Sequence, residues 1–461
     1  MQEVKYNSVE ELLQIAKKTN GHKFREYNTQ KRNLSKNKGG LGQIVEEGVF
    51  HYPVNSKAEA DFKELGVELK VTGIKKNKNN TYSAKERLVL NIINYMNEYN
   101  INFEESSFWK KNAKLLLMFY LYEKGKDFDD FTIIDSVIHD FSDEDLHIIK
   151  KDWEIITNKI KEGKAETLSE SDTMYLGACT KGENAQSNYR QQPNSKVLAR
   201  QRAFSLKQSY MTSIVNKYLI GEKCEKILSY EELVNNTFEM AIEARLSKYY
   251  GKSENELFSL FNGINQKSKD KYNVLIGRML GIKGNINNSE EFKKANITLK
   301  TIRVEENGTI REHMSFPTYE YKKIVQETWE ESTLKEMFES TKFMFVVFKK
   351  KKGIYYFEKI KFWNIPLETI ERKVKPVWEK TVEIVRKGNI VRGRNSSGFI
   401  VNLPGPSFNG VCHTRPHDSK GILKTGKGYE LPVVDKFTGL DRYTKYCFWL
   451  DKNYIIKIIS S

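Results

Sequence analysis

The stretch Asp61-Phe-Lys-Glu-Leu-Gly-Val-Glu-Leu-Lys70 recurs in altered form as Glu291-Phe-Lys-Lys-Ala-Asn-Ile-Thr-Leu-Lys300. Aligned without a gap, both copies read acid, Phe, Lys, three variable residues, an aliphatic residue, one variable residue, Leu and Lys. The apolar positions persist, whereas Glu68 of the first copy becomes Thr298 in the second. This asymmetry predicts two related folded units, of which only the first keeps its acidic residues.

The first copy has the residue types that phosphodiester hydrolysis requires. Residues 66–72 alternate as in a strand, so the apolar side chains point into a core and Glu68 and Lys70 share the other face. Asp61 lies just upstream of this strand. Because Mg²⁺ prefers oxygen ligands, we expect Asp61 and Glu68 to bind Mg²⁺, with the Leu69 carbonyl as a further ligand. Lys70 would orient the attacking water and stabilise developing negative charge.

The spacing alone does not define a nuclease. Charged residues make up 30% of the chain, and further Glu-x-Lys triplets occur at 3–5, 320–322 and 371–373. Most such triplets belong to solvated surfaces. The strand-like alternation around Glu68 and the loss of acids in the second copy favour the catalytic interpretation.

Other short patterns repeat in the same order in both halves. Each pair shares residue types and spacing: Trp153-Glu154 with Gly163 and Trp378-Glu379 with Gly388, Phe204-x-Leu206-x₃-Tyr210 and Phe448-x-Leu450-x₃-Tyr454, Glu104-Glu105-Ser106 and Glu330-Glu331-Ser332. We therefore predict two tandem copies of one α/β fold, over residues 1–220 and 236–461, joined by a linker at 221–235.

Several elements can be assigned from local signals. Ser8 and Glu11 predict a capped amphipathic helix over residues 8–19. We also expect a loop at 28–41, a helix at 42–50, strands at 66–72, 87–93 and 115–122, and a hairpin-like turn at 75–81.

Composition narrows the class of protein. The 461 residues carry a net charge of +16, which favours a polyanionic partner such as nucleic acid, although a lysine-rich surface alone would give the same excess. The longest apolar runs fall short of the roughly 20 residues that span a bilayer, and the first residues are polar. The four cysteines form no CxxC pair, so a thiolate zinc site is not expected. We expect a cytoplasmic protein with no membrane partner.

At this point the residues resemble a known family. The stretch 61–70 closely resembles the signature of the MutH group of GATC-specific DNA endonucleases, which includes a mismatch-repair nickase and the Sau-type type II restriction enzymes. The resemblance continues at Gly42–Glu46, Tyr82–Asn91, Cys179–Gly182 and Arg202–Lys207. The two-copy layout is similar to the Sau-type enzymes. This implies a restriction-endonuclease-like, MutH-like α/β fold in each half, with a mixed central sheet flanked by helices.

The resemblance extends the catalytic set beyond residues 61–70. It implies a helix glutamate behind the metal site, which is Glu46 or its neighbour Glu47. It also implies a second active-site lysine, which is Lys111, with Lys110 as the alternative.

The resemblance also implies a DNA-recognition loop. Lys181 matches a lysine that reads base edges in the major groove, where guanine offers O6 and N7. We expect Lys207, Arg202 and Arg190 to meet phosphates, with a solvated surface charge as the alternative for each arginine. Ser205 stands where the nickase has a tyrosine linked to sensing adenine methylation. This difference favours plain double-strand cutting and leaves methylation sensitivity open.

The second half lacks parts of the metal site. Residues 272–286 offer no carboxylate to replace Glu46. Arg415-Pro-His417 occupies the position of the recognition loop, so DNA binding there is expected to persist. His413 and His417 have no acid or thiol at ligand spacing and are expected to be ordinary loop histidines. By resemblance, this half binds a second DNA site and activates the first half.

The sequence thus predicts a Mg²⁺-dependent type II restriction endonuclease that cuts duplex DNA before the guanine of GATC and leaves a 5′ overhang. One active half per chain makes one nick, so we expect a monomer that dimerises on DNA and uses two GATC sites. The alternatives are a repair-type GATC nickase and a GATC-binding protein that does not cut.

Overall fold

The computed structural model of this chain describes residues 5–32, 39–53, 59–181, 188–396, 398–417 and 426–460. The chain forms two compact units. Unit 1 comprises Met1–Ile242 and Leu280–Ile297, and unit 2 comprises Glu243–Met279 and Thr298–Ser461. The division differs from the predicted one, because the junction residues and the segment Leu280–Ile297 pack with the first half.

Unit 1 is built on a four-stranded sheet with the order β2-β1-β4-β5. Its strands are β1 (Val67–Lys76), β2 (Tyr82–Ala84), β4 (Lys114–Leu121) and β5 (Thr132–Asp140). β1 and β4 run parallel and the other pairs are antiparallel, so the sheet is mixed. The apolar run of β4 occupies a central position, and residues 115–120 are buried.

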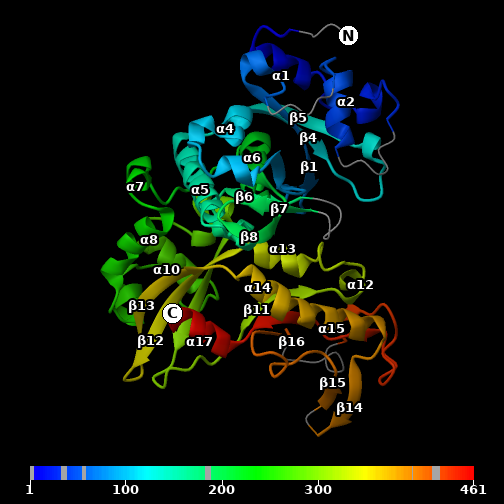
Figure 1. Ribbon diagram of the computed structural model, residues 1–461. Coiled ribbons are helices and arrows are strands. Elements are labelled where there is room, and N and C mark those ends of the chain that lie inside the picture. The colour runs from blue at the N-terminus through cyan, green and yellow to red at the C-terminus, as the bar shows by residue number, and fades with distance from the viewer. Residues whose placement is uncertain are drawn as a thin grey trace. The chain divides into compact units, whose positions relative to one another are not determined.

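Two short helices cover one face of this sheet. α1 (Val9–Lys17) and α2 (Gly40–Gly48) contribute Leu12 and Ile44 to a core shared with Leu116 of β4 (Figure 1). Ser8 caps α1, as predicted, by accepting a hydrogen bond of 3.2 Å from the Glu11 amide. The predicted loop at 28–41 lies partly outside the described residues.

A second, antiparallel sheet in unit 1 has the order β3-β9-β6. The strand predicted at 87–93 is β3 of this sheet, whereas the hairpin partner of β1 is β2. The remaining elements of unit 1 are β3 (Leu88–Ile92), α3 (Tyr95–Glu98), α4 (Ser107–Asn112), α5 (Asp143–Lys161), β6 (Leu176–Thr180), β7 (Tyr189–Gln192), β8 (Ser195–Arg200), β9 (Arg202–Leu206), α6 (Gln208–Ile220), α7 (Tyr230–Val234) and α11 (Glu290–Ala295); α8 (Phe238–Leu246) continues into unit 2.

The segment Leu280–Ile297 is anchored in unit 1 by buried charges. Lys294 of α11 lies 2.8 Å from both carboxylate oxygens of Asp145, which also accepts a hydrogen bond of 2.9 Å from Tyr210. Glu291, the counterpart of Asp61, accepts hydrogen bonds from the amides of Ile227 and Leu228. The repeat's first acid therefore has a structural role in this position.

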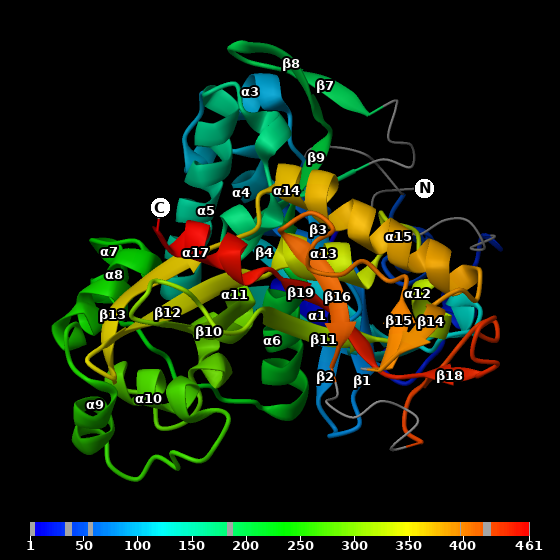
Figure 2. The same ribbon diagram turned by 90° about the horizontal axis from the view of Figure 1, so that it is seen from below.

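Unit 2 contains two three-stranded sheets, with the orders β10-β12-β13 and β11-β19-β16. Figure 2 shows the first of these sheets beside α10. The elements of unit 2 are α9 (Glu254–Leu260), α10 (Lys271–Met279), β10 (Ile297–Val304), β11 (Met314–Tyr319), α12 (Tyr321–Ile324), α13 (Thr333–Ser340), β12 (Lys342–Lys351), β13 (Ile354–Trp363), α14 (Leu367–Thr369), α15 (Lys375–Arg386), β14 (Val391–Asn395), β15 (Gly398–Val401), β16 (Cys412–Pro416), β17 (Tyr429–Glu430), β18 (Arg442–Tyr443), β19 (Tyr446–Leu450) and α17 (Lys452–Ser460). No helix among the described residues has the length and apolarity needed to cross a membrane.

Repeated sequence positions have the same local geometry in the two units. Gly66 and Asn296 both adopt the left-handed conformation, with φ of 63° and 54°, immediately before β1 and β10. The antiparallel pairs β4–β5 and β12–β13 each contain one register shift, at Phe119/Tyr120 and Val347/Phe348. Each shift falls between the sixth and seventh residues of its first strand.

Each of the two repeated glycines lies close to a backbone carbonyl of another segment. A Cβ on Gly163 would lie 2.8 Å from the carbonyl oxygen of Asn194, and one on Gly388 would lie 2.6 Å from that of Val434. Both glycines have positive φ and follow a long helix, α5 or α15. A side chain is therefore excluded at both positions.

Candidate active site

A tight reversal of the chain brings Asp61 alongside the start of β1. Phe62 forms a bridge with Val67, and Gly66 turns the chain between them with positive φ. As a result, the Asp61 amide donates to Oε2 of Glu68 and the Leu69 amide donates to Oδ2 of Asp61, both at 3.1 Å. The two predicted metal ligands are thus held side by side by backbone hydrogen bonds.

Glu68 is the buried centre of this group. It is 2% exposed, and burial raises the pKa of its carboxyl group. Lys70 Nζ lies 2.7 Å from Glu68 Oε1, because residues two apart in a strand share a face. Lys111 Nζ approaches the same oxygen at 3.5 Å from α4. Two ammonium groups therefore offset the cost of burying this carboxylate.

The two candidate helix glutamates lie in different surroundings. Burial, followed by the negative charges of Asp61 and Glu68, raises the pKa of Glu46 to about 7. Glu47 instead forms a two-point ion pair with Arg32, with distances of 2.6 and 2.7 Å, which lowers its pKa. The charges of Asp61 and Glu68 therefore act on Glu46, whereas Glu47 is engaged by Arg32.

The two candidate lysines are separated in the same way. Lys111 reaches Glu68, whereas Lys110 is exposed. Consecutive residues on a helix point about 100° apart, so only one of them can face the site. Lys111 is the lysine that does so.

Tyr52 is a member of the site that the sequence analysis missed. Its hydroxyl donates a hydrogen bond of 2.9 Å to Oδ1 of Asp61, and its side chain is buried. Burial and the negative charge of Asp61 raise the pKa of Tyr52, so it remains a donor at neutral pH. Tyr52 lies in an irregular segment after α2, and no motif or periodicity pointed to it.

The donor set suits a hard divalent cation. Asp61 and Glu68 lie side by side, and their negative charges raise the pKa of Glu46, so the three carboxylates offer the oxygen ligands that Mg²⁺ prefers. Burial is the largest cause of the raised pKa of both Glu46 and Glu68, and the negative charge of Asp61 adds to it in each case. The Leu69 amide holds Asp61, and its carbonyl remains a predicted ligand.

The predicted DNA contacts separate into two groups. Lys181 directly follows β6 and Arg190 lies on β7, and both are exposed at the two sides of residues 182–187, which lie outside the described residues. The Arg190 guanidinium donates to the Gln201 side chain at 2.7 Å and retains solvent access. Both residues remain available to a polyanion.

The other residues of unit 1 that were predicted to contact DNA are buried, so this prediction is wrong for them. Lys207 is 2% exposed and donates to the carbonyl of Thr173. Arg202 is 4% exposed and donates to the carbonyl of Ala178 at 2.6 Å, and Ser205 is fully buried. The basic groups of Arg202 and Lys207 thus bind backbone carbonyls around β6 and β9 and do not face a phosphate.

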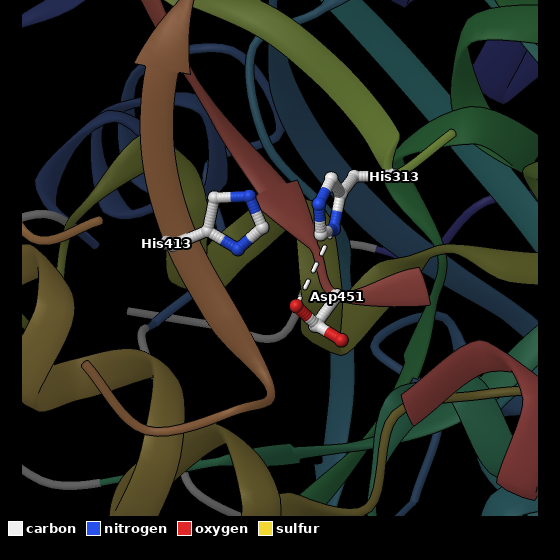
Figure 3. Close-up of side chains that lie close together, drawn as sticks. All are labelled: His313, His413 and Asp451. Atoms are coloured by element: carbon white, nitrogen blue, oxygen red, sulfur yellow. Dashed lines mark ion pairs between the residues drawn. The ribbon is translucent and has the colours of Figure 1, made fainter. Parts of the chain in front are cut away.

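In unit 2, Arg415 and His417 are exposed at the end of β16, and their contacts with DNA stay a prediction. His413, expected to be an ordinary loop histidine without an acidic neighbour, is instead buried on the same strand. It lies beside His313 and Asp451 (Figure 3). The acid is distant in sequence and is brought close by strand pairing.

A mixed sheet that presents an aspartate, a buried glutamate and two lysines at one place supports assignment to the restriction-endonuclease-like class of nucleases. Residues 50–152 match the family described as "DNA mismatch repair enzyme MutH". The chain is 36% identical over 457 residues to the "Type II restriction enzyme Sau3AI" of Staphylococcus aureus, which covers 92% of this chain and 93% of that enzyme. This chain therefore belongs to the Sau3AI-like family of type II restriction endonucleases with a MutH domain.

A second relative matches a smaller part of the chain. It is the "DNA mismatch repair protein MutH" of Buchnera aphidicola subsp. Baizongia pistaciae (strain Bp), 29% identical over 151 residues. The match covers 33% of this chain and 67% of that protein. The likeness to a repair enzyme is thus confined to one part of the chain, whereas the likeness to the restriction enzyme extends over nearly all of it.

Proposed function

We propose that this protein cleaves duplex DNA at GATC in a Mg²⁺-dependent reaction, with unit 1 as the catalytic unit. The observation that carries the proposal is the fold-back of Asp61 beside Glu68, with Lys70 and Lys111 on the same carboxylate. This arrangement provides metal ligands, a lysine for the attacking water, and positive charge near the phosphate.

In this mechanism, Asp61, Glu68 and Glu46 would hold Mg²⁺, which when bound would supply charge neutralisation at the phosphate and activation of water. Lys70 Nζ orients the water for in-line attack on phosphorus, and Lys111 stabilises the charge that develops on the nonbridging oxygens. Water oxygen bonds to phosphorus, the bond to the 3′ oxygen breaks, and that oxygen takes up a proton. Tyr52 acts as a positioning residue, because it orients Asp61.

Recognition of GATC and cleavage before its guanine are inferred from the resemblance to the MutH group. The exposed Lys181, which directly follows β6, is suited to a base edge, and the exposed Arg190 is suited to a phosphate. The repair-type nickase is the second candidate. The 92% coverage by a restriction enzyme favours the first candidate.

We propose further that unit 2 is a second, degenerate copy of the same fold and binds an effector DNA site. Its support is the shared geometry at the paired positions 66/296 and 163/388, and the register shifts at the same positions of the paired strands. Thr298 replaces the buried glutamate. The counterpart of Lys70, Lys300, lines a pocket of about 560 Å³.

The pocket in unit 2 suits binding without cleavage. Its lining includes two acidic residues, Glu305 and Glu312, and more basic side chains, which are Lys269, Lys271, Lys300, Arg303 and Arg311. Lys271 and Arg303 pair with Glu254, and Arg311 pairs with Glu305. Burial lowers the pKa of Lys300, so a phosphate beside it would be stabilising. One catalytic unit per chain makes one nick, so we propose a monomer that dimerises on DNA for double-strand cleavage.

Cleavage of plasmids with zero, one or two GATC sites tests both proposals. We expect linear product with Mg²⁺ and none with EDTA or in Glu68→Ala, and faster cleavage of the two-site plasmid. Equal rates on one-site and two-site plasmids at low enzyme concentration would overturn the effector role. Binding of GATC duplexes without cleavage under any metal would overturn the catalytic proposal and favour a DNA-binding protein.

A further inference from the structure

Three neighbouring strands of unit 2 bring two histidines and an aspartate together. In the sheet β11-β19-β16, Met314 pairs with Leu450 and Leu450 pairs with Cys412. His313 precedes Met314 and Asp451 follows Leu450, so these two residues face each other across antiparallel strands. His413 reaches them from the third strand, and one ligand atom of each residue lies within 4.8 Å of the others (Figure 3).

His413 is the member that requires a partner. Its side chain is fully buried, and neither ring nitrogen has a hydrogen-bond partner among the described residues. Burying polar groups without partners costs on the order of 1–3 kcal/mol each, so native proteins rarely leave them unsatisfied. Figure 3 shows the His413 ring beside His313. A bound cation would satisfy a ring nitrogen directly.

Asp451 and His313 are also oriented so that their ligand atoms lie close together. Oδ1 of Asp451 accepts a hydrogen bond of 2.8 Å from the Asn453 amide at the start of α17, so Oδ2 is directed elsewhere. Oδ2 lies 3.4 Å from Nδ1 of His313. The Lys452 amide also donates to this Nδ1 at 3.1 Å, and a metal at Nδ1 would replace that hydrogen bond.

The spacing suits a four-coordinate metal. With metal–ligand distances of about 2.0–2.1 Å and tetrahedral angles, neighbouring ligand atoms lie roughly 3.4 Å apart. The His313–Asp451 pair already has this separation, at 3.4 Å, and His413 would need to close by about 1.4 Å at most to reach it, since its ligand atom lies within 4.8 Å of the others. Two imidazoles and one carboxylate favour Zn²⁺ and related ions over Mg²⁺.

We propose that His313, His413 and Asp451 form a binding site for a zinc-type transition-metal dication, separate in chemistry from the acidic site of unit 1. The three protein ligands leave the fourth coordination position to water or a ligand. The metal cross-links β11, β16 and the start of α17. It thereby stiffens β16, whose exposed end carries Arg415 and His417.

The test is metal binding by the full-length protein after treatment with a chelator and dialysis. Zn²⁺ stoichiometry is measured by elemental analysis, and Co²⁺ is added as a spectroscopic probe. We expect one tightly bound Zn²⁺ per chain and a visible Co²⁺ spectrum without a thiolate charge-transfer band, since the ligands are nitrogen and oxygen. His413→Ala should lose at least about 100-fold in affinity, equivalent to 2.7 kcal/mol.

The control His417→Ala changes an exposed histidine of the same segment and should bind as the unaltered protein does. Asp451→Asn keeps an oxygen that can cap α17, so it should fold even if His413→Ala does not, and it should also lose Zn²⁺. Thermal unfolding with Zn²⁺ should shift upward for the unaltered protein and for His417→Ala, but not for Asp451→Asn. Absence of stoichiometric Zn²⁺ in the unaltered protein, or its retention in Asp451→Asn, would overturn the proposal.

Discussion

The Tyr52 hydroxyl donates a hydrogen bond of 2.9 Å to Oδ1 of Asp61, while the Leu69 amide holds the other carboxylate oxygen of Asp61 at 3.1 Å. Both oxygens of this predicted metal ligand are therefore oriented by the protein. Such supporting hydrogen bonds commonly change metal affinity or activity by 10–100-fold when they are removed.

Tyr52→Phe is accordingly expected to raise the Mg²⁺ concentration needed for half-maximal cleavage by about 10-fold, with little change in thermal stability. The ring is retained, so packing against Phe62 should persist. Titration of cleavage rate against Mg²⁺ measures the effect. An unchanged Mg²⁺ dependence would remove Tyr52 from the site.

Glu46 and Glu47 form a matched pair of adjacent residues. Glu46→Gln should reduce cleavage by more than about 10-fold, because it removes a carboxylate coupled to Asp61 and Glu68. Glu47→Gln should leave cleavage within about 2-fold and cost up to about 1 kcal/mol of stability through the ion pair with Arg32. The opposite ranking of the two variants would contradict the assignment.

The metal-free protein should lose stability as the pH rises through the pKa of Glu46. The folded-state pKa of about 7 lies above the unfolded value of 4.5, so the folded protein binds more protons between these values. Unfolding temperature in EDTA should therefore fall between about pH 5 and pH 8, and Mg²⁺ should reverse part of the loss. Glu46→Gln should flatten this dependence; an equally steep curve in the variant would assign it to other groups.

Cleavage at limiting Mg²⁺ should show the opposite trend, because Mg²⁺ competes with the proton on Glu46. The rate is expected to rise from pH 6 to pH 8 and to become less dependent on pH when Mg²⁺ is saturating. Initial rates on one plasmid across this range check the trend. A rate independent of pH at limiting Mg²⁺ would argue against Glu46 as a metal ligand.

Lys110 and Lys111 allow a second matched comparison. Lys111→Ala removes an ammonium 3.5 Å from Glu68 and should lower the cleavage rate by at least about 10-fold. Lys110→Ala alters an exposed side chain and should have little effect on the rate at a fixed salt concentration. Single-turnover cleavage separates this effect from DNA binding, and equal losses in both variants would indicate a general electrostatic effect.

The turn at Gly66 should accept asparagine. Asn296 adopts the same left-handed conformation at the equivalent position of the second copy, and a Cβ on Gly66 would have no neighbour within 4 Å. Gly66→Asn should therefore cost less than about 1 kcal/mol, whereas the β-branched Gly66→Val should cost more and displace Asp61 from Glu68. Thermal unfolding and cleavage rates distinguish the two variants, and equal losses would contradict this account of the turn.

Much of the candidate catalytic group could be predicted from local sequence, because Asp61, Glu68 and Lys70 lie within ten residues and strand alternation determines their faces. The choice between Glu46 and Glu47 depends on which face of α2 packs against the sheet, and the sequence leaves this undetermined. Tyr52 comes from an irregular segment, whose path is set by packing and not by periodicity.

The predictions that needed correction depend on contacts distant in sequence. Arg202 and Lys207 resemble DNA-facing residues by charge, but the antiparallel sheet β3-β9-β6 directs them inward to backbone carbonyls. His413 acquires an acidic neighbour only because β16 and β19 pair, which brings Asp451 from 38 positions away. Sequence spacing gives no information about such pairings.

The ion pair between Lys294 and Asp145 has a consequence for how this protein can be divided or recombined. A fragment ending at residue 220 would leave the Asp145 carboxylate without its cation, and would also remove α7 and α11 from unit 1. The halves are therefore not interchangeable cassettes. An exchange of the two halves, by evolution or by engineering, has to transfer residues 280–297 together with the first half. This segment lies in the second half of the sequence but packs in unit 1.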